Sequence, residues 1–159
     1  MNSNRIKFLI YKFPEFGILL AVIISFTIFY VADNSIAETS TLVRMATQGT
    51  CIGFAAYGMG YLMISGEIDL SSGSVAGLTA AISGMMLDSG YSELTSYMAA
   101  LSAAAMVGFL NSFMTLVIGI PSFFGTLGTS FAASGLCIWL LKGRWIYTGD
   151  YIPFLDLIF

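Results

Sequence analysis

The segment Gly66–Gly77, "GEIDLSSGSVAG", places two carboxylates, Glu67 and Asp69, between long stretches that carry no charge. A cluster of serine and glycine follows the acids directly. In a soluble protein, such a segment would be an ordinary surface loop. Its meaning therefore depends on the medium in which the flanking stretches fold, and the composition of the chain indicates that medium.

The composition is typical of an integral membrane protein. Of the 159 residues, 57% are hydrophobic and only 9% are charged, and the mean hydropathy is +0.87. Soluble domains carry roughly 25% charged residues. The chain has no histidine, and Cys51 and Cys137 lie far apart in apolar stretches, so we expect no metal site and no cofactor. It also lacks the basic cluster that a nucleic-acid partner requires, which leaves the lipid bilayer as its first partner.

Charge-free stretches mark the expected membrane spans, because a charge at the centre of the bilayer is costly. A helix needs about 20 apolar residues to cross. We therefore expect an all-α, polytopic membrane helix bundle in residues 16–141, with about five transmembrane helices. Their expected ranges are 16–32, 45–65, 70–87, 94–118 and 121–141. Residues 1–15 would form a cytoplasmic N-terminal segment, and residues 142–159 a loop and a truncated C-terminal end.

The charge-free stretch from Leu94 to Leu141 is too long for one crossing. The sequence "GIPS" (Gly119–Ser122) divides it, because proline disfavours helix in the residue before it and suits the first turn of a new helix. Gly119 would end the fourth helix, and Pro121 would open the fifth. The alternative, one long kinked helix, would far exceed the thickness of the bilayer.

The basic residues predict the orientation. Arg5, Lys7 and Lys12 precede the first span and place the N-terminus in the cytoplasm by the positive-inside rule. The same region also resembles a signal peptide, but its apolar run is slightly long and further spans follow, which favours a retained span. Five crossings would put Lys142 and Arg144 outside, against the rule. An interfacial aromatic belt is indicated around them by Trp139, Trp145, Tyr147 and Tyr151.

The acidic segment would join the second and third helices as a broken or re-entrant stretch near residues 66–74. Asp69, Ser71 and Ser72 are suitable N-caps for the third helix. Irregular backbone at membrane depth persists only where protein or a water-filled cavity surrounds it. Three interpretations stay open. The first is a polar turn at the membrane surface whose acids are solvated and cap the helix. The second is a loop that dips into the protein and supports the gate of a transport pathway, and the third is a direct ion or proton site at Glu67 and Asp69.

Two further features predict helix packing. Gly73, Gly77 and Ala81 recur at four-residue spacing, a pattern that allows another helix to approach closely. Asn111 is the one side-chain amide in the fourth span. It would form either a hydrogen bond between helices or a contact with a substrate.

Three stretches resemble one known family. "GMGYLMISGEIDLSSGSVAGLTA" (Gly58–Ala80) is similar to the GGIDLSVGS segment in permease subunits of bacterial ATP-binding-cassette (ABC) importers for ribose, xylose and similar sugars. "GFLNSFMTLVIGIPSFFGTLGT" (Gly108–Thr129) and then "SGLCIWL" follow in the same order. The resemblance extends from about Ala46 to Leu141. The candidate residues for the motifs and the transport pathway are Glu67, Asp69, Ser71, Gly73, Ser74, Asn111, Pro121, Ser122 and Thr126.

The resemblance implies a multi-pass permease of the bacterial inner membrane that is not itself an enzyme. Its implied partners are an ATP-binding subunit that hydrolyses ATP, a periplasmic sugar-binding protein and a second permease subunit, the same or related. The chain departs from the family pattern at Glu67, where the family has glycine, and at Ser72, where it has valine. It is also shorter than such permeases and corresponds to their N-terminal half, so we expect a truncated chain.

Two other functions remain open on the sequence alone. One is an ion-coupled secondary transporter that uses Glu67 and Asp69. The other is a membrane protein without transport activity, such as an assembly protein or a remnant. A membrane enzyme is least favoured, because the sequence offers no nucleophile–base pair.

Overall fold

The computed structural model describes residues 14–144 and 146, and their regular structure is entirely helical. The chain divides into two compact units, residues 1–50 and residues 51–159, which are described separately. Several predictions lie outside the described residues. They concern the basic N-terminal segment and the aromatic residues and loop after position 144, and they involve Arg5, Lys7, Lys12, Trp145, Tyr147 and Tyr151.

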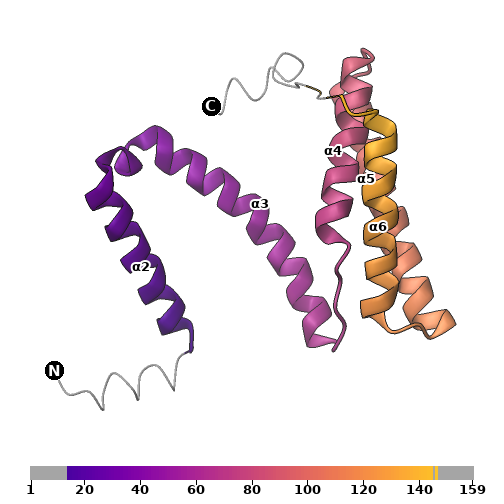
Figure 1. Ribbon diagram of the computed structural model, residues 1–159, viewed down its shortest axis with the longest axis horizontal. Helices are drawn as coiled ribbons and strands as arrows, with labels where there is room; N and C mark the ends of the chain where they lie inside the picture. Colours follow the sequence, from indigo (N-terminus) through magenta and orange to yellow (C-terminus); the bar gives the residue numbers. More distant parts are fainter. Residues whose placement is uncertain (1–13, 145, 147–159) are drawn as a thin grey trace. The chain divides into compact units, whose positions relative to one another are not determined.

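The first unit contains α2 (Pro14–Ala32), the short 3-10 helix η1 (Asn34–Ala37) and the beginning of α3 (Thr39–Ile64) (Figure 1). The apolar run of α2 stops at Asp33, whose backbone N–H still donates to the carbonyl of Phe29 (2.8 Å). The Asp33 carboxylate accepts the backbone N–H of Ser35 (2.9 Å) and so caps η1. This hydrogen bond lowers the pKa of Asp33 below its ordinary value, because it stabilises the charged form.

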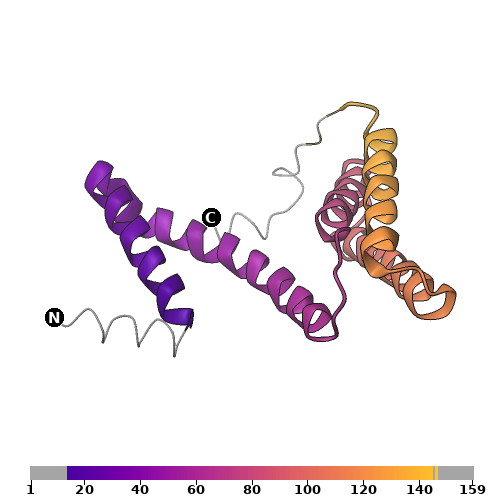
Figure 2. The ribbon, with the colours of Figure 1, turned by 60° about the horizontal axis from the view of Figure 1, so that its bottom comes forward.

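The second unit is built on three helices, α4 (Ser72–Asp88), α5 (Glu93–Phe113) and α6 (Ser122–Leu141). They lie side by side in both views, with α4 in contact with both of the others (Figures 1 and 2). The side chains that α4 buries recur at three-residue spacing, which marks the face of this helix that forms the core. They are Leu78, Ala81, Gly84 and Leu87.

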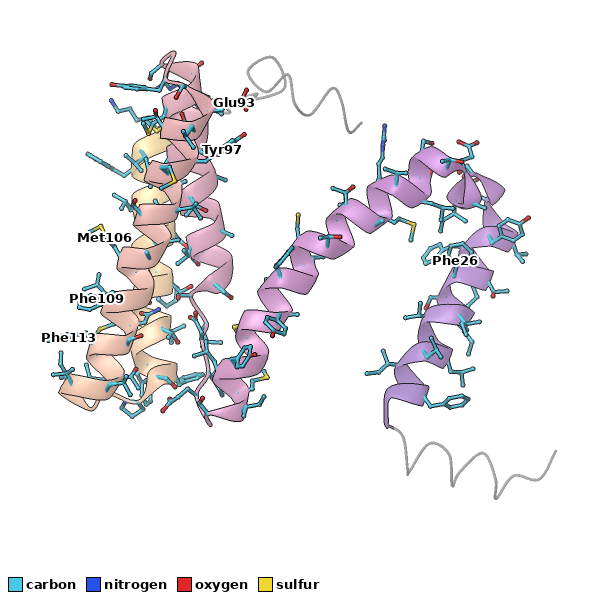
Figure 3. All side chains as sticks on the ribbon, turned by 180° about the vertical axis from the view of Figure 1, so that it is seen from behind. Phe26, Glu93, Tyr97, Met106, Phe109 and Phe113 are labelled. Atoms are coloured by element: carbon cyan, nitrogen blue, oxygen red, sulfur yellow. The ribbon has the colours of Figure 1, made fainter. Side chains whose placement is uncertain are left out.

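The outer surface of these helices is apolar. On α5, Met106, Phe109 and Phe113 project away from the bundle (Figure 3), and Phe109 is 70% exposed. Two helical stretches, Glu93–Ile118 and Ser122–Leu141, are long and apolar enough to cross a membrane by length and composition, and Phe16–Ala32 is a shorter apolar helix. The fold class is therefore an all-α membrane helix bundle. The expected membrane boundaries of the individual spans stay predictions.

A polar seam joins α4 to α6. The hydroxyls of Ser74 and Ser130 are 2.7 Å apart, and the Ser134 hydroxyl donates to Ser74 Oγ (3.0 Å). Small hydroxyls suit this position, because they let two helices approach closely while satisfying each other's hydrogen bonds.

The small-residue stripe predicted on α4 is only partly a packing face. Ala81 is buried, but Gly73 and Gly77 are exposed, with open space where a side chain would lie. At Gly77, α6 does approach closely, because Cys137 Sγ donates to the Gly77 carbonyl (3.5 Å). The contact is made with the backbone carbonyl, and not on the side of the glycine where a β-carbon would lie.

The α5–α6 corner has an unusual backbone. The α-helix widens into one turn of π-helix, η2 (Met114–Ile118), and stops at Gly119, which has a left-handed φ of 81°. The carbonyl of Met114 accepts the backbone N–H groups of both Gly119 and Ile120, the second at 3.0 Å. Pro121 then precedes α6, and its carbonyl accepts the N–H groups of Phe124 (3.0 Å) and Gly125 (3.1 Å). The chain thus forms two separate helices on either side of the "GIPS" sequence.

The left-handed conformation predicts the effect of a side chain at this corner. Gly119→Ala should destabilise the protein by about 1–2 kcal/mol, since a β-carbon disfavours this backbone region. Gly128→Ala is the matched control, because Gly128 lies inside α6 with open space around it and alanine favours helix. Denaturation of the detergent-solubilised protein with sodium dodecyl sulfate, followed by circular dichroism, measures both. Equal stabilities for the two variants would contradict the left-handed conformation of Gly119.

Candidate functional site

The acidic segment forms a non-helical connection between α3 and α4, which we call the acidic link (residues 65–71). Gly66, with a left-handed φ of 79°, ends α3, and its N–H donates to the carbonyl of Met63 (3.0 Å). The N–H of Glu67 donates to the carbonyl of Leu62 (2.9 Å). This pair of bonds is a glycine-based helix C-terminus, and from it the chain runs on toward Ser71.

Hydroxyl groups at the start of α6 hold the backbone of the acidic link. The N–H of Ile68 donates to Ser122 Oγ (3.1 Å), and the N–H of Leu70 donates to Thr126 Oγ1 (3.1 Å). The Thr126 hydroxyl in turn donates to the carbonyl of Ser122 (2.7 Å), and Thr126 is only 4% exposed. Two backbone donors that have no partner in a helix are therefore satisfied by protein, as a low-polarity surrounding requires.

A chain of side-chain hydrogen bonds joins the link to α5 and α6. Asp69 Oδ1 accepts both the N–H (2.7 Å) and the hydroxyl (2.6 Å) of Ser71. Asn111 Nδ2 donates to Ser71 Oγ (2.9 Å), and Thr129 Oγ1 donates to Asn111 Oδ1 (2.7 Å). Ser71 is 1% exposed and Asn111 is 9% exposed. We call this set, Asp69–Ser71–Asn111–Thr129, the polar relay.

The predicted capping of α4 is partly wrong. Asp69 does accept a backbone N–H at the start of the helix, but Ser71 makes no side-chain cap and Ser72 forms no such bond in the described structure. Ser71 already has helical backbone angles (φ −90°, ψ −16°), whereas a capping side chain normally requires an extended residue. Its hydroxyl is used in the polar relay instead.

The geometry bears on the interpretations left open by the sequence. Asp69 accepts the N–H of Ser71 at the start of α4, which fits the capping of the first interpretation, and α6 holds the backbone of the link, which fits the second. The three interpretations of the link stay predictions. Asn111 forms hydrogen bonds between elements, as one of its two interpretations predicts. It also lines a pocket, so the second interpretation, a contact with substrate, stays a prediction.

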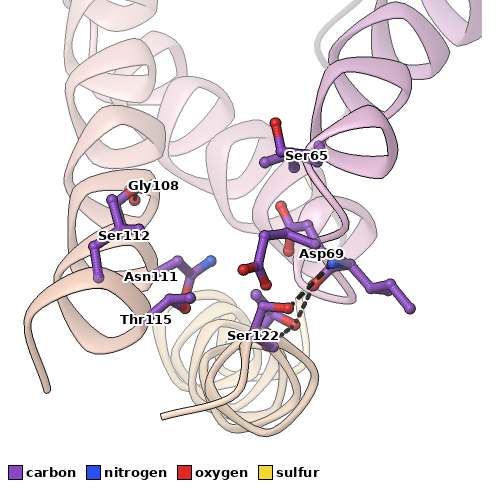
Figure 4. A pocket seen from close by; sticks show the side chains of 12 residues that line it. Ser65, Asp69, Gly108, Asn111, Ser112, Thr115 and Ser122 are labelled. Carbon is purple, nitrogen blue, oxygen red and sulfur yellow. Dashed lines mark hydrogen bonds between the residues drawn. The ribbon is translucent and has the colours of Figure 1, made fainter. Parts of the chain in front are cut away.

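The pocket lies between the acidic link, the end of α5 and the start of α6, and has a volume of about 350 Å³. In Figure 4, Gly108, Asn111, Ser112 and Thr115 lie on one side, with Ser65 and Asp69 across from them and Ser122 nearby. Its size is in the range typical of small-molecule sites, about 300–1,000 Å³. Most of its polar groups are hydroxyls, and both Glu67 and Asp69 line it.

The structure brings together most of the predicted site residues. Glu67, Asp69, Asn111, Ser122 and Thr126 all line the pocket, and Ser71 lies directly behind it in the polar relay. The remaining three lie elsewhere in the bundle: Ser74 is in the α4–α6 seam, Gly73 is exposed on α4, and Pro121 is at the corner before α6.

Sequence reasoning missed several polar partners. Thr129, Ser130 and Ser134 supply the α6 side of the relay and of the seam, and Thr115 lines the pocket. A signal for the first group was present, because the hydroxyls of α6 recur at three- and four-residue spacing on an otherwise apolar helix. Thr115 lies in the π-helical turn, so the spacing rules of a regular α-helix do not predict the direction of its side chain.

Residues 41–151 match the model of a protein family described as "Branched-chain amino acid transport system / permease component". The chain belongs to this family. The matched region contains the acidic link, the polar relay and the pocket, so the candidate site lies wholly within it.

The curated relatives include autoinducer 2 import system permease proteins LsrC. The protein of Photorhabdus laumondii is 32% identical over 83% of this chain and 40% of its own length. That of Escherichia coli SMS-3-5 is 30% identical over 83% of this chain and 39% of its own, and that of Yersinia pseudotuberculosis YPIII is 30% identical over 80% and 36%. The permease chain thus spans about two fifths of the length of these relatives. No solved structure matches it.

The polar relay predicts that Asn111 is a stabilising residue of this permease. Asn111→Leu should lower the free energy of unfolding by about 1–3 kcal/mol, because it removes two hydrogen bonds between elements within a membrane protein. Ser112→Ala is the control, since the Ser112 hydroxyl bonds only the Gly108 carbonyl of its own helix, and its effect should stay within about 0.5 kcal/mol. The same detergent denaturation measures both, and an Asn111→Leu variant as stable as the wild type would exclude the relay as a structural element.

Proposed function

We propose that this chain is a transmembrane permease subunit of an ABC importer, that it forms part of the translocation pathway, and that the solute is a monosaccharide of the ribose or xylose type. The observation that supports the proposal is the convergence of the sequence motifs on one site. The Ile-Asp-Leu-Ser motif, the Gly-x-x-Asn motif and the Pro-Ser motif are separate in sequence, yet their side chains share one set of hydrogen bonds beside one pocket.

The partners follow from the same proposal. An ATP-binding subunit would supply energy, because the sequence contains no phosphate-binding Gly-x-x-x-x-Gly-Lys loop. A periplasmic sugar-binding protein would deliver the solute, and a second permease subunit, identical or related, would complete the pathway in the inner membrane. The N-terminus would face the cytoplasm. In this assembly the bundle of α4, α5 and α6 acts as a rigid wall, and the acidic link faces the pocket.

The lining of the pocket favours a hydroxyl-bearing solute. Hydroxyl, amide and carboxylate groups all line it, and each of them can exchange hydrogen bonds with a sugar. The family description names branched-chain amino acids, and the relatives are named for autoinducer 2. Leu62, Ile68 and Leu116 also line the pocket, whose surface is mostly apolar. A sugar would place its carbon–hydrogen faces against these side chains and pair its hydroxyls with the polar groups.

Uptake in the native host tests the proposal. Deleting the coding sequence should abolish accumulation of radiolabelled ribose or xylose, and expression of the intact chain from its own locus should restore it. Accumulation should stop when ATP is depleted and should continue when a protonophore collapses the ion gradients. A tagged chain should also retain an ATP-binding subunit during purification in mild detergent. Uptake unchanged by the deletion would indicate a protein without transport activity and would overturn the proposal.

Asp69 separates the proposal from an ion-coupled transporter. Asp69→Asn removes the charge but keeps the Oδ1 acceptor that Ser71 uses, so the ABC permease should retain most of its uptake. Asp69→Ala removes the acceptor as well and should lose stability together with uptake. An ion-coupled transporter predicts that Asp69→Asn is as defective as Asp69→Ala, and that uptake depends on the proton or sodium gradient.

A further inference from the structure

We propose that Glu67 is a ligand-binding residue, and that its carboxylate accepts hydrogen bonds from the hydroxyl groups of a small, neutral, polyhydroxylated solute in the pocket. This inference rests on the proposed function, which it deepens by assigning the selectivity of the pocket to one side chain. It concerns a position at which the chain departs from the glycine of the resembling sugar permeases.

The hydrogen bonds divide the pocket lining into two groups. The first group is already bonded within the protein: Asp69 Oδ1 to Ser71, both ends of the Asn111 amide to Ser71 and Thr129, and the Thr126 hydroxyl to the link and to its own helix. The polar atoms of these side chains that form the bonds are therefore engaged within the protein. Their role is to hold the wall of the pocket in place.

Glu67 belongs to the second group. It is half-buried and lines the pocket, yet within the described residues neither of its carboxylate oxygens has a hydrogen-bond or ion-pair partner. Thr115, on the facing wall, likewise makes no side-chain hydrogen bond there. The carboxylate oxygens of Glu67 are therefore free to accept hydrogen bonds, and the pocket is where the donors of a solute would reach them.

The charge of the pocket selects the class of solute. Glu67 and Asp69 both line it, and no lysine or arginine is among the lining residues. Such a site favours groups that donate hydrogen bonds and disfavours anions. The hydroxyls of a sugar supply donors without adding charge. An amino acid would bring a carboxylate that faces two like charges beside an ammonium that they attract, whereas a sugar brings neutral donors alone, and we infer that the pocket selects the sugar.

Binding to the purified chain tests the assignment directly. Saturation-transfer NMR of the detergent-solubilised protein should detect D-ribose or D-xylose and not L-leucine. Glu67→Gln should weaken sugar binding about tenfold, because hydrogen bonds to a charged acceptor are roughly twice as strong as those to a neutral one. Glu93→Gln is the matched control: Glu93 is also half-buried and lies at the opposite end of α5 from Phe113 (Figure 3), and its change should leave binding intact. Sugar binding equal in the two variants, or none to the wild type, would overturn the inference.

A second measurement requires no change at Glu67. Ser112 lines the pocket, so a Ser112→Cys variant in which Cys51 and Cys137 are replaced by alanine carries one thiol there. A cationic methanethiosulfonate should label this thiol about tenfold faster than an anionic one, and ribose, unlike leucine, should slow the labelling. Equal rates for the two reagents, or protection by leucine, would contradict the assigned selectivity.

The two proposals fail in different ways. Neither the NMR measurement nor the labelling involves ATP or a partner subunit. Sugar binding that depends on Glu67, without ATP-dependent uptake, would overturn the importer function and leave the pocket assignment standing. ATP-dependent sugar uptake that Glu67→Gln leaves unchanged, with no sugar binding to the pocket, would do the reverse.

Discussion

The hydrogen bonds of Asn111 are the constraint on which the described bundle depends. An amide side chain within an apolar helix must find partners in the protein, because lipid offers none. Asn111 finds one on each side, Ser71 at the end of the acidic link and Thr129 on α6. Since the amide donates only through Nδ2 and accepts only through Oδ1, this residue defines how the link, α5 and α6 meet. No buried side-chain nitrogen or oxygen in the described part of the chain lacks a partner.

Serine and threonine supply most of the other polar contacts, and their chemistry explains why. A helical hydroxyl can donate to the carbonyl one turn earlier and still accept a hydrogen bond from elsewhere. Thr126 does both, with its own helix and with the N–H of Leu70. The irregular backbone of the acidic link is therefore supported without placing a further charge in the bundle. The break between α3 and α4 leaves backbone N–H groups without helical partners. Hydroxyl groups, which are small enough to fit between packed helices, accept their hydrogen bonds.

The sequence predicted the helical membrane fold well, because charge-free stretches and the Gly-Ile-Pro break depend on the bilayer and on local backbone chemistry. Asp69 and Asn111 were candidates because polar residues are conspicuous in an apolar chain, and Ser122 and Thr126 because of the family resemblance; all four line one pocket. It did not predict which face of α4 packs against α6. Gly73 and Ser74 are adjacent in the sequence, and the choice between their two faces of the helix depends on the hydroxyls of Ser130 and Ser134, which bond Ser74. The role of Ser71 was missed for a similar reason: whether a serine caps a helix or bonds a distant amide depends on tertiary contacts.

The two acids of the link, only two residues apart, have opposite surroundings. Asp69 is bonded to Ser71 and acts as part of the wall, whereas Glu67 has no partner among the described residues and lines the pocket. The backbone explains why an acid is accommodated at position 67. Gly66 supplies the left-handed residue that ends α3, and Glu67, whose φ is not positive, only has to donate its N–H to Leu62. A second glycine is therefore not required by the turn, and a side chain at this position enters the pocket instead of the packed seam between helices. The substitution thus changes the chemistry of the pocket while leaving the fold of the link intact.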